Sequence, residues 1–144
     1  MIGDVVMKPH SSLWFNCAVR GDVNNIKIGI RTNIQDGTII HTSSDNGATL
    51  IGDNVVVGHK CLLHACIVED ACMIGMGSTV MDYSVIETGA WVAAGSLVTP
   101  NKRIKKRELW IGRPAKFLRH VISEETEEIS RIVSNYVVRA QEYS

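Results

Sequence analysis

Three histidines near the middle of the chain, His41, His59 and His64, are the residues best suited to chemistry. A neutral imidazole is among the commonest metal ligands, and three protein ligands around zinc leave one coordination position open for water. An open position of this kind is typical of a catalytic zinc site rather than a structural one. The histidines therefore predict a metal site, provided that the fold brings their side chains together.

Polar residues upstream of these histidines could surround such a site. They are Arg20, Asp22, Gln35 and Asp36. Groups of this kind can hold the tautomers of metal ligands and orient a bound hydroxide. Simpler roles are open as well: Arg20 and Asp22 could form an ion pair at an interface. Gln35 and Asp36 could satisfy backbone groups at a turn, since Asp-Gly is a turn signature.

The elements that position these side chains follow from an aliphatic residue at every sixth position. The longest series is Val68, Ile74, Val80, Ile86, Val92 and Val98, and shorter series are Met7-Leu13-Val19, Ile28-Ile34-Ile40 and Ile51-Val57-Leu63. Neither the helical period nor simple alternation predicts a step of six. Three such units close a triangular coil of about 18 residues, and coils stack as parallel strands roughly 4.8 Å apart. We predict an all-β solenoid, a parallel β-helix of about five coils, over residues 1–100.

Two segments interrupt the period, and a different pattern follows it. Extra residues fall within 20–25 and within 42–49, and the second segment has the composition of a protruding loop. Residues 101–144 are expected to form a basic connector, an extended return segment over 109–118, and a helix with Ser123 as its N-cap. One face of that helix is apolar and should pack on the β-helix within the same domain.

The register of the repeat decides which histidines meet. His41 follows Ile40 and His64 follows Leu63, and each of these is the third anchor of its coil, so the two histidines are expected one rung apart in one column. His59 follows the second strand of its coil and lies elsewhere on the prism. The simplest completion is His59 from another subunit, which repeated around a threefold axis gives a homotrimer with three equivalent sites.

Composition narrows the possible functions. The 144 residues contain 15 Lys+Arg and 15 Asp+Glu, so the formal net charge is zero, which argues against a broad basic surface. No apolar run approaches the roughly 18 residues that cross a bilayer, and no secretory signal is visible. We expect a cytoplasmic protein with no nucleic-acid partner and no membrane partner.

The cysteines are interpreted as core residues rather than as a disulfide framework. Cys17, Cys61 and Cys72 occupy a small inward position of the repeat, whereas Cys66 lies off that position counted from the preceding anchor. A buried cysteine commonly behaves as a small apolar side chain.

Several motifs together resemble the gamma-class carbonic anhydrase family. They include Val19-Arg20-Gly21-Asp22, Asn33-Ile34-Gln35-Asp36-Gly37-Thr38, Val57-Gly58-His59, Leu63-His64-Ala65-Cys66 and Leu109-Trp110-Ile111-Gly112-Arg113-Pro114. The resemblance implies a left-handed β-helix trimer with zinc at each interface, iron and cobalt being alternatives. It also implies that His41 and His64 of one subunit and His59 of the next bind the metal.

The same resemblance implies roles for the polar residues and a substrate. Arg20 and Asp22 would pair between subunits, and Gln35 would position the metal-bound hydroxide with Asn33 and Asp36 nearby. The reaction implied is reversible hydration of CO2 by that hydroxide. Better-characterised members carry proton-shuttle glutamates after the Arg-Gly-Asp stretch and in a longer acidic loop. Here Val23 takes the first place, and the loop contains Asp45 but no glutamate. The chain also opens within a repeat, where relatives have about one more coil.

Two other functions stay open at this point. Many hexapeptide-repeat proteins are acyl- or acetyltransferases that bind a coenzyme A donor between subunits and use a histidine as general base. A metal-stabilised trimer could also serve as a non-catalytic assembly subunit.

Overall fold

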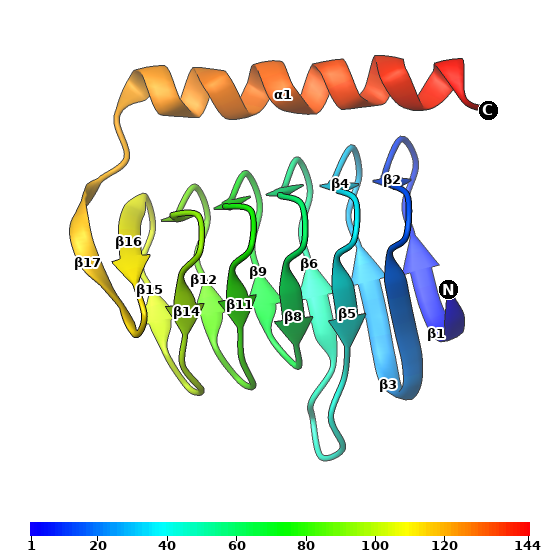
Figure 1. Ribbon diagram of the computed structural model, residues 1–144, viewed down its shortest axis with the longest axis horizontal. Coiled ribbons are helices and arrows are strands. Elements are labelled where there is room, and N and C mark those ends of the chain that lie inside the picture. The colour runs from blue at the N-terminus through cyan, green and yellow to red at the C-terminus, as the bar shows by residue number, and fades with distance from the viewer.

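The computed structural model describes residues 1–144 and shows a parallel β-solenoid of about six turns with one C-terminal helix (Figure 1). The predicted fold class is therefore confirmed, with one turn more than expected. Short parallel strands stack into three ladders that form the faces of a triangular prism.

We name the three faces by what lies on them. The helix face contains β2 (Ser12–Leu13), β4 (Asn33–Ile34), β7 (Val56–Val57), β10 (Met73–Ile74), β13 (Trp91–Val92), β16 (Glu108–Gly112) and, at its edge, β17 (Ala115–His120). The histidine face contains the first part of β3 (Ala18–Ile28), β5 (Ile39–His41), β8 (Leu62–His64), β11 (Thr79–Val80) and β14 (Leu97–Val98). The open face contains β1 (Ile2–Met7), the last part of β3, β6 (Thr49–Ile51), β9 (Ile67–Val68), β12 (Val85–Ile86) and β15 (Arg103–Ile104).

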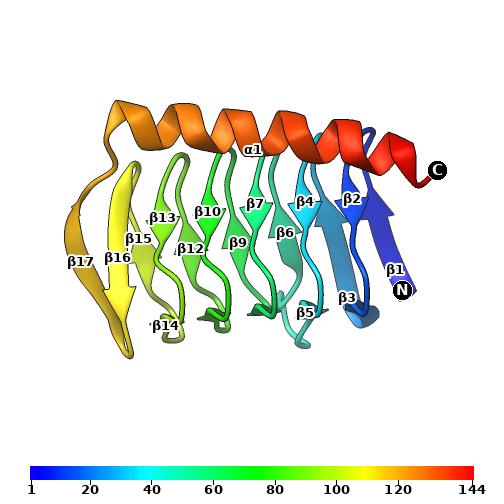
Figure 2. The same ribbon diagram turned by 45° about the horizontal axis from the view of Figure 1, so that its top comes forward.

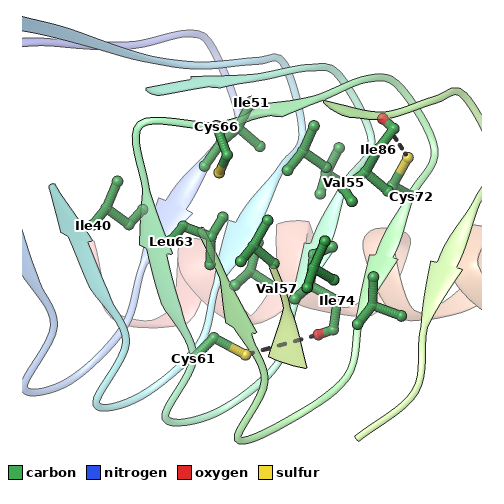
Figure 3. Close-up of a cluster of buried hydrophobic side chains, with 14 of the residues drawn as sticks. Ile40, Ile51, Val55, Val57, Cys61, Leu63, Cys66, Cys72, Ile74 and Ile86 are labelled. Carbon is green, nitrogen blue, oxygen red and sulfur yellow. Dashed lines mark hydrogen bonds between the residues drawn. The ribbon is translucent and has the colours of Figure 1, made fainter. Parts of the chain in front are cut away.

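The core is the column of aliphatic anchors that the six-residue spacing predicts. Ile40, Leu63, Ile74 and Ile86 are all completely buried and point into the prism (Figure 3). Inward hydroxyl groups bond to the neighbouring coil, as when Thr38 Oγ1 donates to the Gly58 carbonyl at 3.0 Å. Each rung thus buries an aliphatic side chain and also satisfies its inward polar group, as a close-packed interior requires.

All four cysteines are free, and three of them are buried in this core. Cys61 and Cys72 face inward as predicted (Figure 3). Cys66 is also completely buried, because it lies two residues before Val68, and the inward position is set by the following anchor. Burial raises the pKa of the Cys66 thiol to about 12, so it stays protonated and packs as a small apolar group.

The repeat continues beyond residue 100, where the sequence placed its end. Ile104 and Trp110 keep the six-residue spacing after Val98, and Ile104 is completely buried. β15 pairs with β12, and β16 pairs with β13. The basic residues around Ile104 concealed the period, and this last coil accounts for part of the additional turn.

The segment after β16 does not return along the solenoid as predicted. β16 and β17 form an antiparallel hairpin that closes the end of the prism. The chain reverses after Gly112, whose φ of +109° is a conformation that only glycine adopts readily. The return is made instead by α1 (Ser123–Glu142), which lies along the helix face (Figure 2).

The helix packs through the apolar face predicted for it. Ile129 and Val133 are buried against Val56 of β7. Its N-cap is Ile122 rather than the predicted Ser123, and the Glu125 carboxylate accepts the Ile122 N–H at 2.9 Å. α1 does not combine the length and apolar character that crossing a membrane requires.

The two interruptions of the repeat have different structures. Residues 20–25 lie inside β3, which continues from the histidine face onto the open face. Residues 42–48 form the loop between β5 and β6 that projects from the prism, as predicted (Figure 1). The Tyr83 hydroxyl donates to the carbonyls of Ser44 and Asp45 at 3.3 Å and ties this loop to the turn between β11 and β12, two coils further along.

Candidate metal centre

His41 and His64 end two neighbouring strands and face each other. β5 and β8 pair in parallel with His41 opposite His64, which is the juxtaposition expected from the register. His41 Nδ1 lies 3.1 Å from His64 Nε2. Both rings are largely shielded from solvent, with side-chain exposures of 18% and 31%.

Each of these rings is held from behind by a carboxylate. Asp22 Oδ1 lies 3.0 Å from His41 Nε2, and Asp82 Oδ1 lies 2.7 Å from His64 Nδ1. Arg20 Nη1 in turn donates to Asp22 Oδ2 at 2.6 Å within the same chain. This hydrogen bond is the main reason that the pKa of Asp22 lies below its usual value. Arg20 therefore keeps the Asp22 carboxylate ionised where it contacts the His41 imidazole.

The carboxylates determine which ring nitrogens are free. An ionised carboxylate only accepts hydrogen bonds, so the ring nitrogens that face Asp22 and Asp82 carry the protons. With those tautomers, His41 Nδ1 and His64 Nε2 each carry a lone pair at neighbouring positions, an arrangement that a positive group bound by both nitrogens would stabilise. Two nitrogens bound to tetrahedral zinc at about 2.0–2.1 Å lie roughly 3.3–3.4 Å apart. The 3.1 Å separation is close to that value, so the pair fits a metal ion.

His59 lies at a different corner of the prism. It follows β7 of the helix face, whereas His41 and His64 end strands of the histidine face. Its Nδ1 is 3.1 Å from Asp36 Oδ2, so its Nε2 is the nitrogen left free. Within one chain, no three His, Cys, Asp or Glu side chains are arranged to hold a metal. His59 and the His41–His64 pair are thus not brought together by a single subunit.

An apolar strip separates the two corners. The outward side chains of the histidine face are aligned in register as Ala18, Ile39, Leu62, Thr79 and Leu97. Ile39 and Leu62 are 48% and 37% exposed, although they lie in the middle of the face. An exposed apolar strip bordered by polar residues is a common feature of protein interfaces.

Asn33 and Gln35 lie at the same corner of the prism as His59 and not at the corner of His41 and His64. Gln35 Nε2 donates to Asn33 Oδ1 at 3.0 Å, and both side chains are buried. Gln35 also lines a cavity of about 480 Å³ between the helix face and α1, walled mainly by apolar side chains such as Met76 and Trp91. The predicted polar residues therefore form two groups, with Arg20 and Asp22 at one corner and Asn33, Gln35 and Asp36 at the other.

Asp82 is the residue of this site that the sequence did not identify. Its signal was present in the repeat, because Val80 pairs with Leu63 and Asp82 follows Val80 by two residues. The register that places His64 beside His41 puts Met81 in the same column and Asp82 one residue further along, at the same corner.

Comparisons with known proteins agree with the resemblance to gamma-class carbonic anhydrases that the sequence motifs indicated. The chain is 50% identical over 146 residues to gamma carbonic anhydrase 2, mitochondrial, of Arabidopsis thaliana, covering 98% of this chain and 52% of that protein. It is 45% identical over 141 residues to a carbonic anhydrase of Geobacillus kaustophilus, covering 98% of this chain and 77% of that protein. No family model matches the chain.

Solved structures show the same fold. A hexapeptide transferase family protein from Anaplasma phagocytophilum has a TM-score of 0.93 at 46% identity, covering 99% of this chain and 83% of that chain. A hexapeptide-repeat acetyltransferase of Vibrio cholerae complexed with acetyl coenzyme A has a TM-score of 0.70 at 21% identity, covering 83% and 72%. That second likeness concerns the fold alone. The chain spans about half the length of gamma carbonic anhydrases 2 and 1 of Arabidopsis thaliana, 52% and 54%.

Proposed function

The chain belongs to the gamma carbonic anhydrase family, and from this we propose that it is a zinc-dependent enzyme that hydrates CO2 reversibly at a trimer interface. Iron and cobalt are the alternative metals. The observation that carries the proposal is the pair of lone pairs on His41 Nδ1 and His64 Nε2, held 3.1 Å apart by carboxylates behind each ring. Two neighbouring lone pairs repel each other, and His41 Nδ1 and His64 Nε2 would hold a divalent metal that replaces this repulsion by two coordinate bonds.

We propose that the third ligand is His59 of a neighbouring subunit. Its Nδ1 is engaged by Asp36, which leaves Nε2 free to bind a metal, and no third ligand joins the pair within one chain. The exposed strip of Ile39 and Leu62 between the two corners supports a subunit contact on this face. Burial of that strip would bring the His59 corner of one subunit beside the His41–His64 corner of the next.

The chain's own residues have defined tasks in this reaction. A bound divalent metal lowers the pKa of its water toward 7 and so supplies the nucleophile at neutral pH. Asp22, Asp36 and Asp82 fix the tautomers and orientations of the three imidazoles. Gln35 gives its N–H to Asn33 and keeps its carbonyl oxygen free to accept a hydrogen bond from the reacting water. The apolar cavity beside Gln35 suits an uncharged, apolar substrate such as CO2.

Metal analysis combined with stopped-flow CO2 hydration tests the proposal. We expect one metal per subunit, hydration activity that disappears on chelation, and recovery of that activity when zinc is restored. Substoichiometric metal after zinc reconstitution would exclude the site. Bound metal without hydration would leave the non-catalytic assembly subunit as the function.

Asp82→Asn should weaken metal binding while the fold is retained. The amide keeps the size of Asp82 but can donate to His64 Nδ1, which favours the wrong tautomer and turns the lone pair away from His41. We expect zinc affinity, measured by competition with a chromogenic chelator, to fall by about 10–100-fold.

Glu127→Gln is the matched control, because it makes the same change from carboxylate to amide at an exposed position of α1, away from the histidine face. An Asp82→Asn protein with unchanged zinc affinity would show that Asp82 does not position His64.

The acyltransferase alternative is kept because of the shared fold, although the acetyltransferase structure is only 21% identical. It uses a histidine as base and needs no metal. Binding of acetyl coenzyme A to the metal-free protein would favour it over CO2 hydration.

A further inference from the structure

The closing end of the solenoid concentrates the positive charge of a neutral chain. Residues 102–120 contain eight Lys and Arg and a single acidic residue, Glu108, whereas the whole chain has 15 of each sign. The fold gathers this segment into β15, β16 and β17, at one end of the prism (Figure 1). Overall neutrality, which argued against a broad basic surface, therefore conceals a strong separation of charge.

Most of this charge is not neutralised within the chain. Arg103 pairs with Glu87, and Arg119 pairs with Glu125 of α1. None of the other six basic residues has a carboxylate within ion-pair distance, and all six are exposed: Lys102, Lys105, Lys106, Arg107, Arg113 and Lys116. Self-repulsion of unpaired like charges destabilises a surface unless an anionic partner offsets it.

Exposed apolar side chains stand among these charges. Ile111 of β16 and Phe117 and Leu118 of β17 are 46%, 49% and 54% exposed, and Ile122 beyond β17 is 49% exposed. β17 is also the edge strand of the helix-face sheet, with a neighbour on one side only. Large apolar side chains on a charged edge strand cost solubility, and such a combination is typical of an interaction surface.

We infer that this end, residues 102–122, is a docking surface for an anionic lipid membrane. Basic residues near such a surface are attracted to the phosphate groups, while exposed Phe, Leu and Ile side chains can enter the interface between headgroups and acyl chains. Nucleic acid would satisfy the charges but would leave the aliphatic side chains in water.

A second copy of the chain is a poor occupant of this surface. Two such ends meeting face to face would oppose like charges. The other end of the prism, residues 1–28, carries Lys8, Arg20 and Lys27 against Asp4 and Asp22 and offers no compensating negative charge. The acidic start of α1 borders the basic end. Its Glu125 is paired with Arg119 and its Glu128 with Arg131, whereas the exposed Glu124 and Glu127 keep their negative charge, which confines the attraction to the strands.

Vesicle flotation of the full chain tests the inference. The probes are vesicles of phosphatidylcholine alone and vesicles with about one third phosphatidylglycerol, at low and high salt. We expect binding to the anionic vesicles only, and loss of that binding at high salt. Lys105→Glu/Lys106→Glu should weaken binding by at least about tenfold, since each basic residue near the surface contributes severalfold. Phe117→Ser/Leu118→Ser should weaken it at unchanged charge.

Lys8→Glu/Lys27→Glu is the matched control, with the same change of charge at the opposite end, and it should bind as the wild type does. Circular dichroism melts verify that all variants fold. No binding to anionic vesicles overturns the inference, as does equal binding by the Lys105→Glu/Lys106→Glu and control variants. Flotation that a single-stranded oligonucleotide abolishes, with Phe117→Ser/Leu118→Ser binding like the wild type, assigns the surface to polyanions instead.

Discussion

Replacing any one of His41, His59 and His64 by alanine should abolish metal binding and CO2 hydration together. Three imidazoles form the proposed ligand set, and two of them retain a metal weakly while leaving its water poorly activated. We expect hydration in stopped-flow assays to fall below about 1% of wild type, with less than one metal per subunit by elemental analysis. His120→Ala is the control, because His120 is an exposed histidine on β17 that lies apart from the site.

Mixing two inactive variants distinguishes a shared site from a site within one chain. A His59→Ala subunit still supplies His41 and His64, and a His64→Ala subunit still supplies His59. In randomly mixed trimers, about one quarter of the interfaces join an intact pair to an intact His59. Recovery of metal and hydration to about that fraction is therefore expected after the two variants are unfolded and refolded together.

A mixture that stays inactive although mixed trimers are present by native mass spectrometry would refute sharing. A mixture of His41→Ala and His64→Ala should stay inactive whether the site is shared or lies within one chain. Every subunit in that mixture lacks one histidine of the His41–His64 pair.

Ile86→Ala should be among the most destabilising single substitutions in the chain. Ile86 of β12 is completely buried in the column of anchors, where each coil packs on the next. Removing buried methyl groups costs the transfer free energy and leaves a cavity that the rigid coils cannot close. We expect the free energy of unfolding in urea to fall by about 2–5 kcal/mol.

Ile67→Ala provides the same change of side chain on the paired strand β9, where Ile67 points outward and is 40% exposed. Its cost should stay within about 1 kcal/mol. Equal losses for the two variants would mean that the inward and outward positions of the repeat are not energetically distinct.

The six-residue period allowed most of the fold to be predicted from local sequence alone. Each anchor specifies its own short strand, and each strand pairs only with strands of the neighbouring coils, so a local pattern determines the long-range order. The same spacing predicts that His41 lies opposite His64, and the pairing of β5 with β8 confirms it. The end of the repeat was misplaced because the charged residues around Ile104 outweighed a spacing that continues to Trp110.

The tertiary structure identified Asp82 as the carboxylate that holds His64, and it revealed the charge of one end of the prism. Asp82 meets His64 through the stacking of two coils that are 18 residues apart in sequence. The basic residues of 102–120 form one surface because β15, β16 and β17 close the same end of the solenoid. Composition counts charges over the whole chain, whereas electrostatic attraction depends on where the fold places them.

The sequence by itself determined the fold class, the family resemblance and the pairing of two histidines, since each depends on spacing within neighbouring repeats. The structure decided which ring nitrogens are free, where His59 lies, and that unpaired positive charge gathers at one end of a neutral chain. These properties depend on contacts between coils and on the corners of a prism, and no single repeat encodes them.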